Sequence, residues 1–375
     1  MKLFEWIFDP YSYPFWIFIF SIIAAVLVAL IISFSAYVKF VYPNAKFEAM
    51  GNPYVKDKGL ISIIDSRNLS DFKEHLNALK DYKVEGETSN ELQESLDKSF
   101  LTTVEMMKKD SPKKMNEFYN TYLEKIDVYL VKNVLKNKLL EKTSDETIIS
   151  RAILPSTKEL LQNIINAKKE DLQSILKTYG FSEEIVDSIS DKDTDFLLLD
   201  SSIDKYVMKR FKTVKVPYKC EQAKQKFVKT MIDIQNIKNV LRAKQLDYDE
   251  QSCMKLFLGD GREIASWKYK EITEADSVSQ VISSLEGTSY YNELKDAIEQ
   301  YNKEQSVQVL ENALDRNFLK QMKDISTQNY VTIGPTIKFL VSKEFEIKNL
   351  KIVAKGVDEH LSSELIKGFL IKEAA

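Results

Sequence analysis

Glycine and proline are scarce in this sequence, which has only 10 Gly and 8 Pro among 375 residues. An average composition of about 7% Gly and 5% Pro would give two to three times as many. Because both residues end helices and form tight turns, their scarcity predicts long helices joined by few turns. Hydrophobic residues at 44% and charged residues at 29% supply a core and a solvated surface. The length favours two or three domains.

Cysteine and histidine are nearly absent, and this limits the chemistry that the chain can perform. Cys220 and Cys253 form neither a CxxC pair nor a disulfide framework, so we interpret them as buried or incidental thiols in a reducing compartment. His75 and His360 are far apart, and no HExxH motif or ligand cluster indicates a metal. There is no P-loop and no GxSxG motif, and Gly259–Gly261 is typical of a turn. The sequence predicts no catalytic, cofactor-binding or metal-binding residues.

Neither sign of charge dominates, because the sequence has 53 basic and 56 acidic residues and a net charge of -3. Proteins that bind nucleic acid carry a clustered Lys/Arg footprint that matches the phosphates. No half of this chain is strongly basic, so we expect no nucleic-acid partner. The many acidic residues are spread along predicted helices, which is typical of a solvated face rather than of paired catalytic carboxylates.

Charged residues are missing altogether from Pro10 to Val38. Within this segment, Phe15–Val38 is a run of 24 residues. A helix of that length can cross a hydrocarbon core of about 30 Å with some tilt. Aromatic residues flank the run as in an interfacial belt: Trp6, Tyr11, Tyr13, Trp16, Tyr37 and Tyr42. We therefore predict one membrane-spanning helix over Phe15–Val38 in contact with the lipid bilayer.

A cleaved signal peptide is the alternative for this segment. Glu5 and Asp9 stand beside Lys2 in the leading region, the apolar run is too long, and no A-x-A cleavage site is clear. We therefore favour a retained anchor. Lys39 and Lys46 follow the span, and this basic bias places the large C-terminal body in the cytoplasm, held at the cell membrane by a single pass.

One sequence pattern occurs three times in the remainder of the chain. Ile126–Lys138 reads IDVYLVKNVLKNK, Ile232–Lys244 reads IDIQNIKNVLRAK, and Phe345–Val357 reads FEIKNLKIVAKGV. In each copy apolar residues recur at i, i+3, i+6 and i+7, which is one stripe on a helix. The alternative explanation is that any amphipathic helices show a similar apolar pattern. The in-register IDxxxxKNVL identity of the first two copies argues against it.

Each copy also carries a pair of basic residues one turn apart, away from the apolar stripe. Cations near a helix C-terminus complement the helix dipole. Two interpretations stay open: the pairs are solvated charges at helix ends, or they contact a partner protein. The six candidate contact residues are Lys132, Lys136, Lys238, Arg242, Lys351 and Lys355.

Shorter segments recur ahead of these helices. Asn68, Asp171 and Ser277 are each expected to cap a short amphipathic helix. The repeats therefore predict an all-α fold of three pseudo-equivalent helical bundles of about 105 residues that pack side by side. We divide the chain into an N-terminal membrane anchor, 1–43, and three helical repeats, 44–145, 146–250 and 251–375.

Three stretches resemble a known family. The opening Y-x-N-A-K-x-x-A-M of Tyr42–Met50, the helix Ile232–Lys244 and the tail Pro335–Gly356 are similar in order and spacing to the C subunit of the archaeal, A-type ATP synthase, a relative of the d subunit of vacuolar ATPases. The resemblance covers residue 42 to the end. It departs at Lys46, where the family usually has Arg, a change that would lose a bidentate contact. The segment before Tyr42 is extra to the family.

The resemblance implies a funnel made of three similar bundles, with no reaction of its own. It implies a non-catalytic rotor subunit that receives the D and F subunits of the central stalk, sits on the membrane proteolipid rotor ring, and transmits torque for ATP synthesis driven by proton or sodium transport. The alternatives are a membrane-anchored helical scaffold or tether unrelated to the ATPase, and a membrane-bound enzyme whose site lacks a recognisable motif. If the body rotates, we expect Phe15–Val38 to lie in the lumen of the ring, where it cannot meet the stator.

Overall fold

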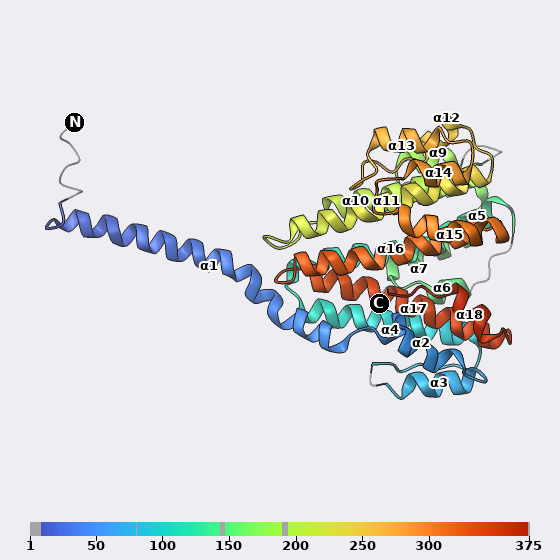
Figure 1. Ribbon diagram of the computed structural model, residues 1–375, viewed down its shortest axis with the longest axis horizontal. Coiled ribbons are helices and arrows are strands. Elements are labelled where there is room, and N and C mark those ends of the chain that lie inside the picture. Colours follow the sequence, from blue (N-terminus) through green and yellow to red (C-terminus); the bar gives the residue numbers. More distant parts are fainter. Residues whose placement is uncertain (1–8, 80, 143–146, 190–193, 374–375) are drawn as a thin grey trace.

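The computed structural model describes residues 9–79, 81–142, 147–189 and 194–373. It has two parts, a long helix α1 (Tyr13–Met50) and a helical body from which the N-terminal half of α1 projects (Figure 1). No strand occurs in these described ranges. The predicted all-α class is therefore confirmed.

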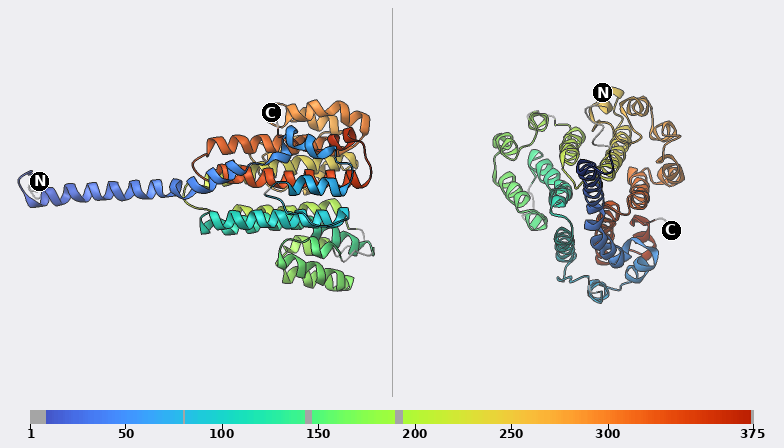
Figure 2. Two further views of the ribbon diagram at one scale, coloured as in Figure 1. Left: turned by 90° about the horizontal axis from the view of Figure 1, so that it is seen from below. Right: turned by 90° about the vertical axis from the view of Figure 1, so that its left-hand side faces the viewer.

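Six long helices form the centre of the body. Each contacts the next, and α17 contacts α4, so the contacts close into a ring that the end-on view of Figure 2 shows. The short turns that join α4 to α5, α10 to α11 and α16 to α17 lie at the end of the body from which α1 leaves (Figure 1). The helices are α4 (Ser89–Asp110), α5 (Asn116–Leu139), α10 (Phe196–Thr213), α11 (Glu221–Gln245), α16 (Val307–Gln328) and α17 (Gly334–Asp358).

The three repeated segments lie in α5, α11 and α17, which alternate with the other three helices around the ring. Val134, Val240 and Val353, at matching positions of the apolar stripe, are each fully buried. Burial of a valine of this kind stabilises the fold by about 1.5–3 kcal/mol. The stripes are thus core positions, as expected. The exact division of the chain into three repeats stays a prediction.

Short helices cover the outside of the ring (Figure 2). Two of the three predicted caps are present, because Asn68 accepts from the backbone N–H of Asp71 at 2.9 Å and Ser277 from that of Gln280 at 3.3 Å. The expected cap at Asp171 is wrong: this residue already has helical backbone angles, and its side chain forms no cap. It ends a 3-10 turn, η4 (Lys169–Asp171), that runs directly into the helix.

The outer elements comprise eleven helices and two further 3-10 turns in the described residues. The helices are α2 (Asp57–Ile64), α3 (Leu69–Asn77), α6 (Thr147–Arg151), α7 (Pro155–Asn166), α8 (Leu172–Thr178), α9 (Glu183–Ser188), α12 (Glu250–Lys255), α13 (Ser266–Thr273), α14 (Val278–Ser284), α15 (Tyr291–Glu304) and α18 (Ser363–Phe369). Two further 3-10 turns are η2 (Pro53–Val55) and η3 (Lys113–Met115).

A cluster of aromatic side chains fills the middle of the ring. Tyr122 of α5 stacks on Phe227 of α11 with ring centroids 6.3 Å apart, although α10 separates these helices around the ring. Further edge-to-face, tilted and stacked pairs, each with centroids 5.8 to 6.4 Å apart, link five of the six helices. Such pairs add about 0.5–1.5 kcal/mol beyond burial. Where this aromatic cluster lies, side chains therefore fill the interior of the ring. The members of the cluster are Phe118, Tyr122, Phe211, Phe227, Phe318 and Phe345.

Helix α1 differs in character between its two ends. One 18-residue window has a mean hydropathy of 3.1 and no buried residue, so by length and composition this helix could cross a membrane. Towards its C-terminus, Phe40 and Phe47 are buried in the body, where Phe47 stacks on Phe339 of α17 at 5.1 Å. The helix continues to Met50 through Pro43. The expected boundary between residues 43 and 44 therefore falls inside one unbroken helix.

Candidate functional site

Five of the six candidate contact residues form ion pairs where the repeated helices meet their neighbours. We refer to the α5–α10, α11–α16 and α17–α4 contacts as the first, second and third seams. In each seam a cation of the repeated helix forms an ion pair with a carboxylate of the neighbouring helix. The pairs are Lys132–Asp204 and Lys136–Asp200 (2.5 Å) in the first seam, Lys238–Asp315 (2.6 Å) and Arg242–Glu311 (2.5 Å) in the second, and Lys351–Asp97 in the third.

These ion pairs are half-buried rather than solvated. The side chains of Lys132 and Lys238 are only 13% and 12% exposed, and Arg242 holds Glu311 through two hydrogen bonds of 2.5 and 2.8 Å. A bidentate arginine–carboxylate pair is among the stronger polar contacts in proteins. Five of the six basic residues therefore join one helix of the ring to the next, and Lys355 does not. Contact with a partner protein stays a prediction for all six.

The third seam has one ion pair where the other two seams have two. Lys355 is 54% exposed and pairs at 2.5 Å with Glu359, the residue that follows its own helix. In the first seam the two acids, Asp200 and Asp204, stand four residues apart on α10. Four residues before Asp97 on α4 stands Gln93, which has no charge to offer Lys355. The seam that closes the ring thus has fewer ion pairs between its two helices than the other seams have.

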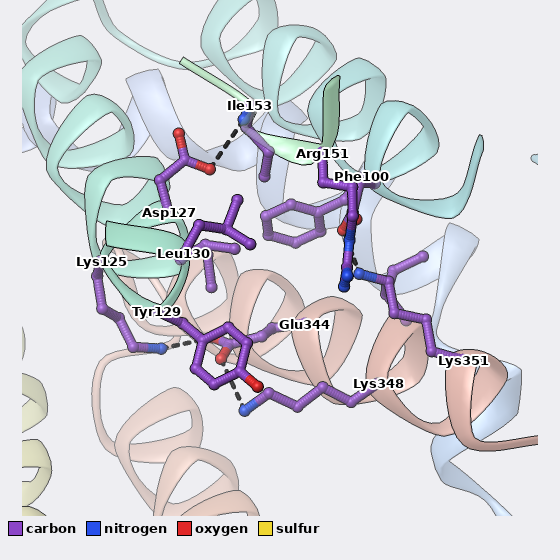
Figure 3. A pocket seen from close by; sticks show the side chains of 13 residues that line it. Phe100, Lys125, Asp127, Tyr129, Leu130, Arg151, Ile153, Glu344, Lys348 and Lys351 are labelled. Atoms are coloured by element: carbon purple, nitrogen blue, oxygen red, sulfur yellow. Dashed lines mark hydrogen bonds and ion pairs between the residues drawn. The ribbon is translucent and has the colours of Figure 1, made fainter. Parts of the chain in front are cut away.

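A cavity of about 410 Å³ lies beside this third seam, between α4, α5, α17 and Arg151 at the end of α6 (Figure 3). Its apolar walls come from Phe100, Ile126, Leu130, Ile153 and Ile347. Lys125 and Lys348 approach Glu344, and the ends of Arg151 and Lys351 lie side by side in Figure 3. A volume of this order is within the range of ligand pockets and of pockets that accept a partner's side chains.

The Glu344 carboxylate accepts hydrogen bonds from three side chains around this cavity. It is buried, and Lys125, Lys348 and the hydroxyl of Tyr122 all donate to it, the two lysines at 2.7 and 3.0 Å. Burial alone would raise its pKa, but the charges of Lys125 and Lys348 outweigh burial and hold the pKa of Glu344 well below its usual range. Burial also raises the pKa of Tyr122, so that the phenol remains a donor.

The opposite side of the cavity has a surplus of positive charge. Asp97 is the carboxylate that faces both Lys351 and Arg151, and the Nε atom of Arg151 is buried with no hydrogen-bond partner in the described part of the chain. Burial raises the pKa of Asp97 and lowers that of Lys351. Two cations that share one carboxylate leave room for an additional acceptor at this point.

The acidic residue of the repeat has a role that the sequence reasoning missed. Asp233 is fully buried, and its carboxylate accepts from the backbone N–H groups of Arg262, Glu263 and Ile264 at 2.8 to 2.9 Å. A Cβ on Gly261 would lie 1.8 Å from this carboxylate, so the close approach requires glycine there. The carboxylate thus fixes the loop that precedes α13.

The equivalent acids of the other copies are also buried and accept hydrogen bonds, Asp127 from backbone N–H groups and Glu346 from side chains. Asp127 accepts from the N–H groups of Ile153 and Leu154, both at 2.8 Å, and Glu346 accepts from Tyr82 and from Lys343. Each repeated helix is therefore tied to the outer segment of the next part of the ring. Burial raises the pKa of all three acids. The in-register Asp of IDxxxxKNVL was the signal that could have revealed this role.

In the part of the chain that the structure describes, no arrangement of these groups resembles a catalytic centre. Within the same ranges, no group of three or more His, Cys, Asp or Glu side chains could hold a metal ion. Both cysteines are free and buried, which confirms their interpretation as buried thiols, and burial raises the pKa of Cys220 to about 12. A thiol with that pKa is protonated and unreactive at neutral pH.

Comparison with known proteins agrees with the closed helical body. The sequence model of the family described as ATP synthase (C/AC39) subunit matches residues 43–369. The chain belongs to this family. The C/AC39 match begins after the apolar part of α1, so the predicted membrane span lies outside it.

Individual relatives of the C/AC39 family match along most of their length. The C subunit of the A-type ATP synthase of Methanobrevibacter smithii is 30% identical over 327 residues, covering 84% of each chain. That of Methanocaldococcus jannaschii is 29% identical and covers 88% of this chain and 86% of the relative. That of Thermococcus onnurineus is 26% identical over 90% of this chain and 92% of the relative.

The family resemblance seen in the sequence is therefore confirmed. As a C/AC39 subunit, the chain is a structural part of an ATP synthase rather than its catalytic subunit, and it associates with that membrane-bound complex.

Proposed function

We propose that this chain is the non-catalytic rotor subunit that couples the central stalk, made of the D and F subunits, to the membrane proteolipid ring and transmits torque between them. The observation that carries the proposal is the closed ring of six helices in a member of the C/AC39 family. A torque adapter must resist twisting, and close-packed helices with few glycines are stiff. The aromatic cluster and the ion pairs of the three seams supply that resistance.

In this proposal the body is a funnel of three bundles whose wide opening receives the stalk. The third-seam cavity, with its apolar walls and its surplus of positive charge, is a suitable contact for an apolar side chain and an acid of the stalk. Lys355 is the most exposed of the six repeated cations, so it is the one that we expect to reach a partner. Reversing the other five would break the seams as well as any external contact.

The same proposal places α1 in a membrane, with the body on the cytoplasmic side. Three contacts support a rigid connection: Asn44 donates to the carbonyls of Tyr330 and Thr332 at 2.9 and 2.7 Å, and Lys46 pairs with Asp110 at 2.7 Å. Because Phe40 and Phe47 of the same helix are buried in the body, removal of a signal peptide would have to cut a helix that is part of the fold.

A rotating body must carry its membrane helix along. An anchor in the bulk lipid outside the ring would sweep around it and meet the stator. In the end-on view of Figure 2, α1 leaves the body within the outline of the helices rather than at its edge. We therefore expect Phe15–Val38 to lie in the lumen of the proteolipid ring, near the rotation axis.

The decisive experiment is purification of the native complex with a tag on this chain. The D and F subunits and the ring should co-purify, and a photo-cross-linker at Val26 should reach only the inner helices of the ring. Lys355→Glu should weaken retention of the stalk, while Lys303→Glu, an exposed control, should not. Co-purification of neither stalk nor ring, as expected for an unrelated tether, would refute the coupling role; cross-links only to the stator would refute the lumen position alone.

A further inference from the structure

Two of the turns at the α1 end of the body carry lysines around a hollow of about 690 Å³. The hollow lies between the start of α5 and the α10–α11 turn. In the described part of the chain, no hydrogen bond or ion pair reaches the ammonium groups of four exposed lysines that line it, Lys113, Lys114, Lys212 and Lys215, and that of Lys212 extends toward Gly259. We refer to these four residues as the lysine hollow.

A fifth lysine and two acids also line the hollow. Lys224 is buried, donates to the carbonyl of Val214 at 2.5 Å and pairs with Glu221 at 3.0 Å. Glu117 also lines the hollow and is not committed to Arg210, which forms its ion pair with Glu124 at 2.6 Å. With Lys224 paired to Glu221 and one charge offset by Glu117, the lysine hollow keeps a local positive charge of about three. Such a cluster is unfavourable unless an anion or solvent compensates it.

The position of the hollow along α1 is fixed by Lys219, in the same α10–α11 turn. Its ammonium donates to Ser33 at 2.7 Å and to the hydroxyl of Tyr37 at 3.1 Å, and it lies 4.7 Å from the centroid of the Tyr37 ring. Both residues are at the C-terminal end of the span Phe15–Val38 that we predict. If α1 crosses a membrane, this turn is at the level of the lipid headgroups.

The side chains next to the lysines are of types that are common at the level of the lipid headgroups. Tyr218, in the α10–α11 turn, is 67% exposed, and Val216 of the same turn lines the hollow. Exposed tyrosines and lysines are common at membrane interfaces, where the ring or the methylene stem contacts the acyl region and the polar end stays among the headgroups. The C-terminal turns of α5 and α11, by contrast, lie at the far end of these helices, roughly 36 Å away at 1.5 Å per residue.

We propose that the lysine hollow binds the phosphate of an anionic phospholipid whose acyl chains lie along α1. Primary ammonium groups donate to phosphate oxygens, and several near a membrane surface attract anionic lipid together. The bound lipid holds the body against the membrane and fixes the depth of α1. This inference rests on the membrane-anchored form of the proposed function; within a rotor ring, the lipid would be one of those that fill the lumen.

The test is native mass spectrometry of the full chain released from detergent with equal amounts of phosphatidylglycerol and phosphatidylcholine. We expect the chain to retain phosphatidylglycerol preferentially. The variant K113Q/K114Q/K212Q/K215Q should lower that preference by about tenfold or more. The matched control K142Q/K168Q/K255Q/K303Q removes the same charge from four exposed lysines elsewhere on the body and should keep the preference. Equal retention by all three proteins would overturn the proposal.

Two further arms separate the sources of the anion. Inorganic phosphate at the lipid concentration should not displace the lipid; displacement would mean a free-anion site and overturn the lipid assignment. Lysine acylation of the full chain should show protection of Lys113 and Lys215 when anionic lipid is added. Protection only by added rotor ring, without lipid, would assign the hollow to an acidic protein surface and would also overturn the proposal.

The outcomes for the two proposals remain distinguishable. A chain that fails to co-purify with stalk and ring but prefers phosphatidylglycerol would refute the coupling role and keep the lipid site. A chain that co-purifies but shows no lipid preference would refute the lipid site alone.

Discussion

Lys351 of α17 pairs with Asp97 of α4, and this contact closes the ring between the last and the first of its long helices. The two residues are 254 positions apart in sequence, and their side chains are 22% and 13% exposed. The corresponding pairs in the other seams, Lys132–Asp204 and Lys238–Asp315, join helices that are closer in the chain. Closure of the ring therefore depends on a longer-range contact than the other seams do.

Loss of this pair should destabilise the body. Lys351→Met leaves Asp97 with Arg151 as its remaining nearby cation, and we expect a loss of about 1–3 kcal/mol in the free energy of unfolding. Urea unfolding of the full chain in detergent measures it, and a double-mutant cycle with Asp97→Asn isolates the pair. Lys270→Met, which breaks an exposed pair with Glu274 at 3.9 Å, should change stability by less than about 0.5 kcal/mol. Similar losses for both lysines would contradict the expectation.

A second ion pair can be restored to the third seam. Gln93→Glu places a carboxylate one turn before Asp97, at the position that Asp200 takes in the first seam. Lys355 should then exchange Glu359 for the new acid, and stability should rise by about 0.2–1 kcal/mol. The gain should disappear when Lys355 is changed to Met in the same protein. A stability unchanged or lowered by Gln93→Glu would show that the third seam is not equivalent to the others.

Removal of the buried carboxylate of α11 should be among the most damaging substitutions. Asp233→Ala leaves the three N–H groups of 262–264 and the hydroxyl of Tyr290 without their acceptor. We expect a loss of about 3–5 kcal/mol. The midpoint of thermal unfolding measures it, with exposed Asp276→Ala as the control. Hydrogen exchange at the amides of Glu263 and Ile264 should accelerate. Unchanged exchange there would mean that the loop keeps its conformation without the Asp233 carboxylate.

The connection between α1 and the body should depend on Asn44. Its amide donates to two carbonyls and accepts from the hydroxyl of Thr336 at 3.0 Å, all in a buried site. Asn44→Ala should cost about 1–3 kcal/mol and loosen the helix where it enters the body. Limited proteolysis should then cut between residues 40 and 50 faster than in the wild type. Asn302→Ala, on an exposed surface, should leave the cleavage rate unchanged.

Two acids of α17 should respond to pH in opposite directions. The pKa of Glu344 is well below its ordinary value of 4.5, so its contribution to stability is present above about pH 4.5 and is lost as the pH falls through the folded pKa. The stability advantage of the wild type over Glu344→Gln should therefore shrink on acidification below about pH 4.5. Thermal unfolding between about pH 7 and pH 3 measures this difference.

Glu346 provides the matched comparison. Burial raises its pKa above 4.5, so the folded state binds the proton more tightly than the unfolded state does. Stability then falls as the pH rises from about 4.5 through the folded pKa. In that range the free energy of unfolding of the wild type should decrease relative to that of Glu346→Gln. Parallel pH profiles for the two variants would refute this assignment of charges.

The helical architecture of this protein follows from local features of its sequence. Helical periodicity and helix breakers act over a few residues, so the scarcity of Gly and Pro, the stripes through Val134, Val240 and Val353, and the apolar run Phe15–Val38 could all be recognised without a structure. The cap expected at Asp171 failed for a local reason as well, because a 3-10 turn ahead of it already supplied the helical backbone.

The role of the repeated charges, by contrast, is set by tertiary packing. Lys238 and its neighbours look in sequence like a basic helix end, but their acids are about 60 to 250 residues away and meet them only when the ring closes. The buried role of Asp233 likewise depends on a loop 29 to 31 residues downstream that glycine allows to approach. Partner choice at such distances is set by the packing of whole helices, which a local pattern does not encode.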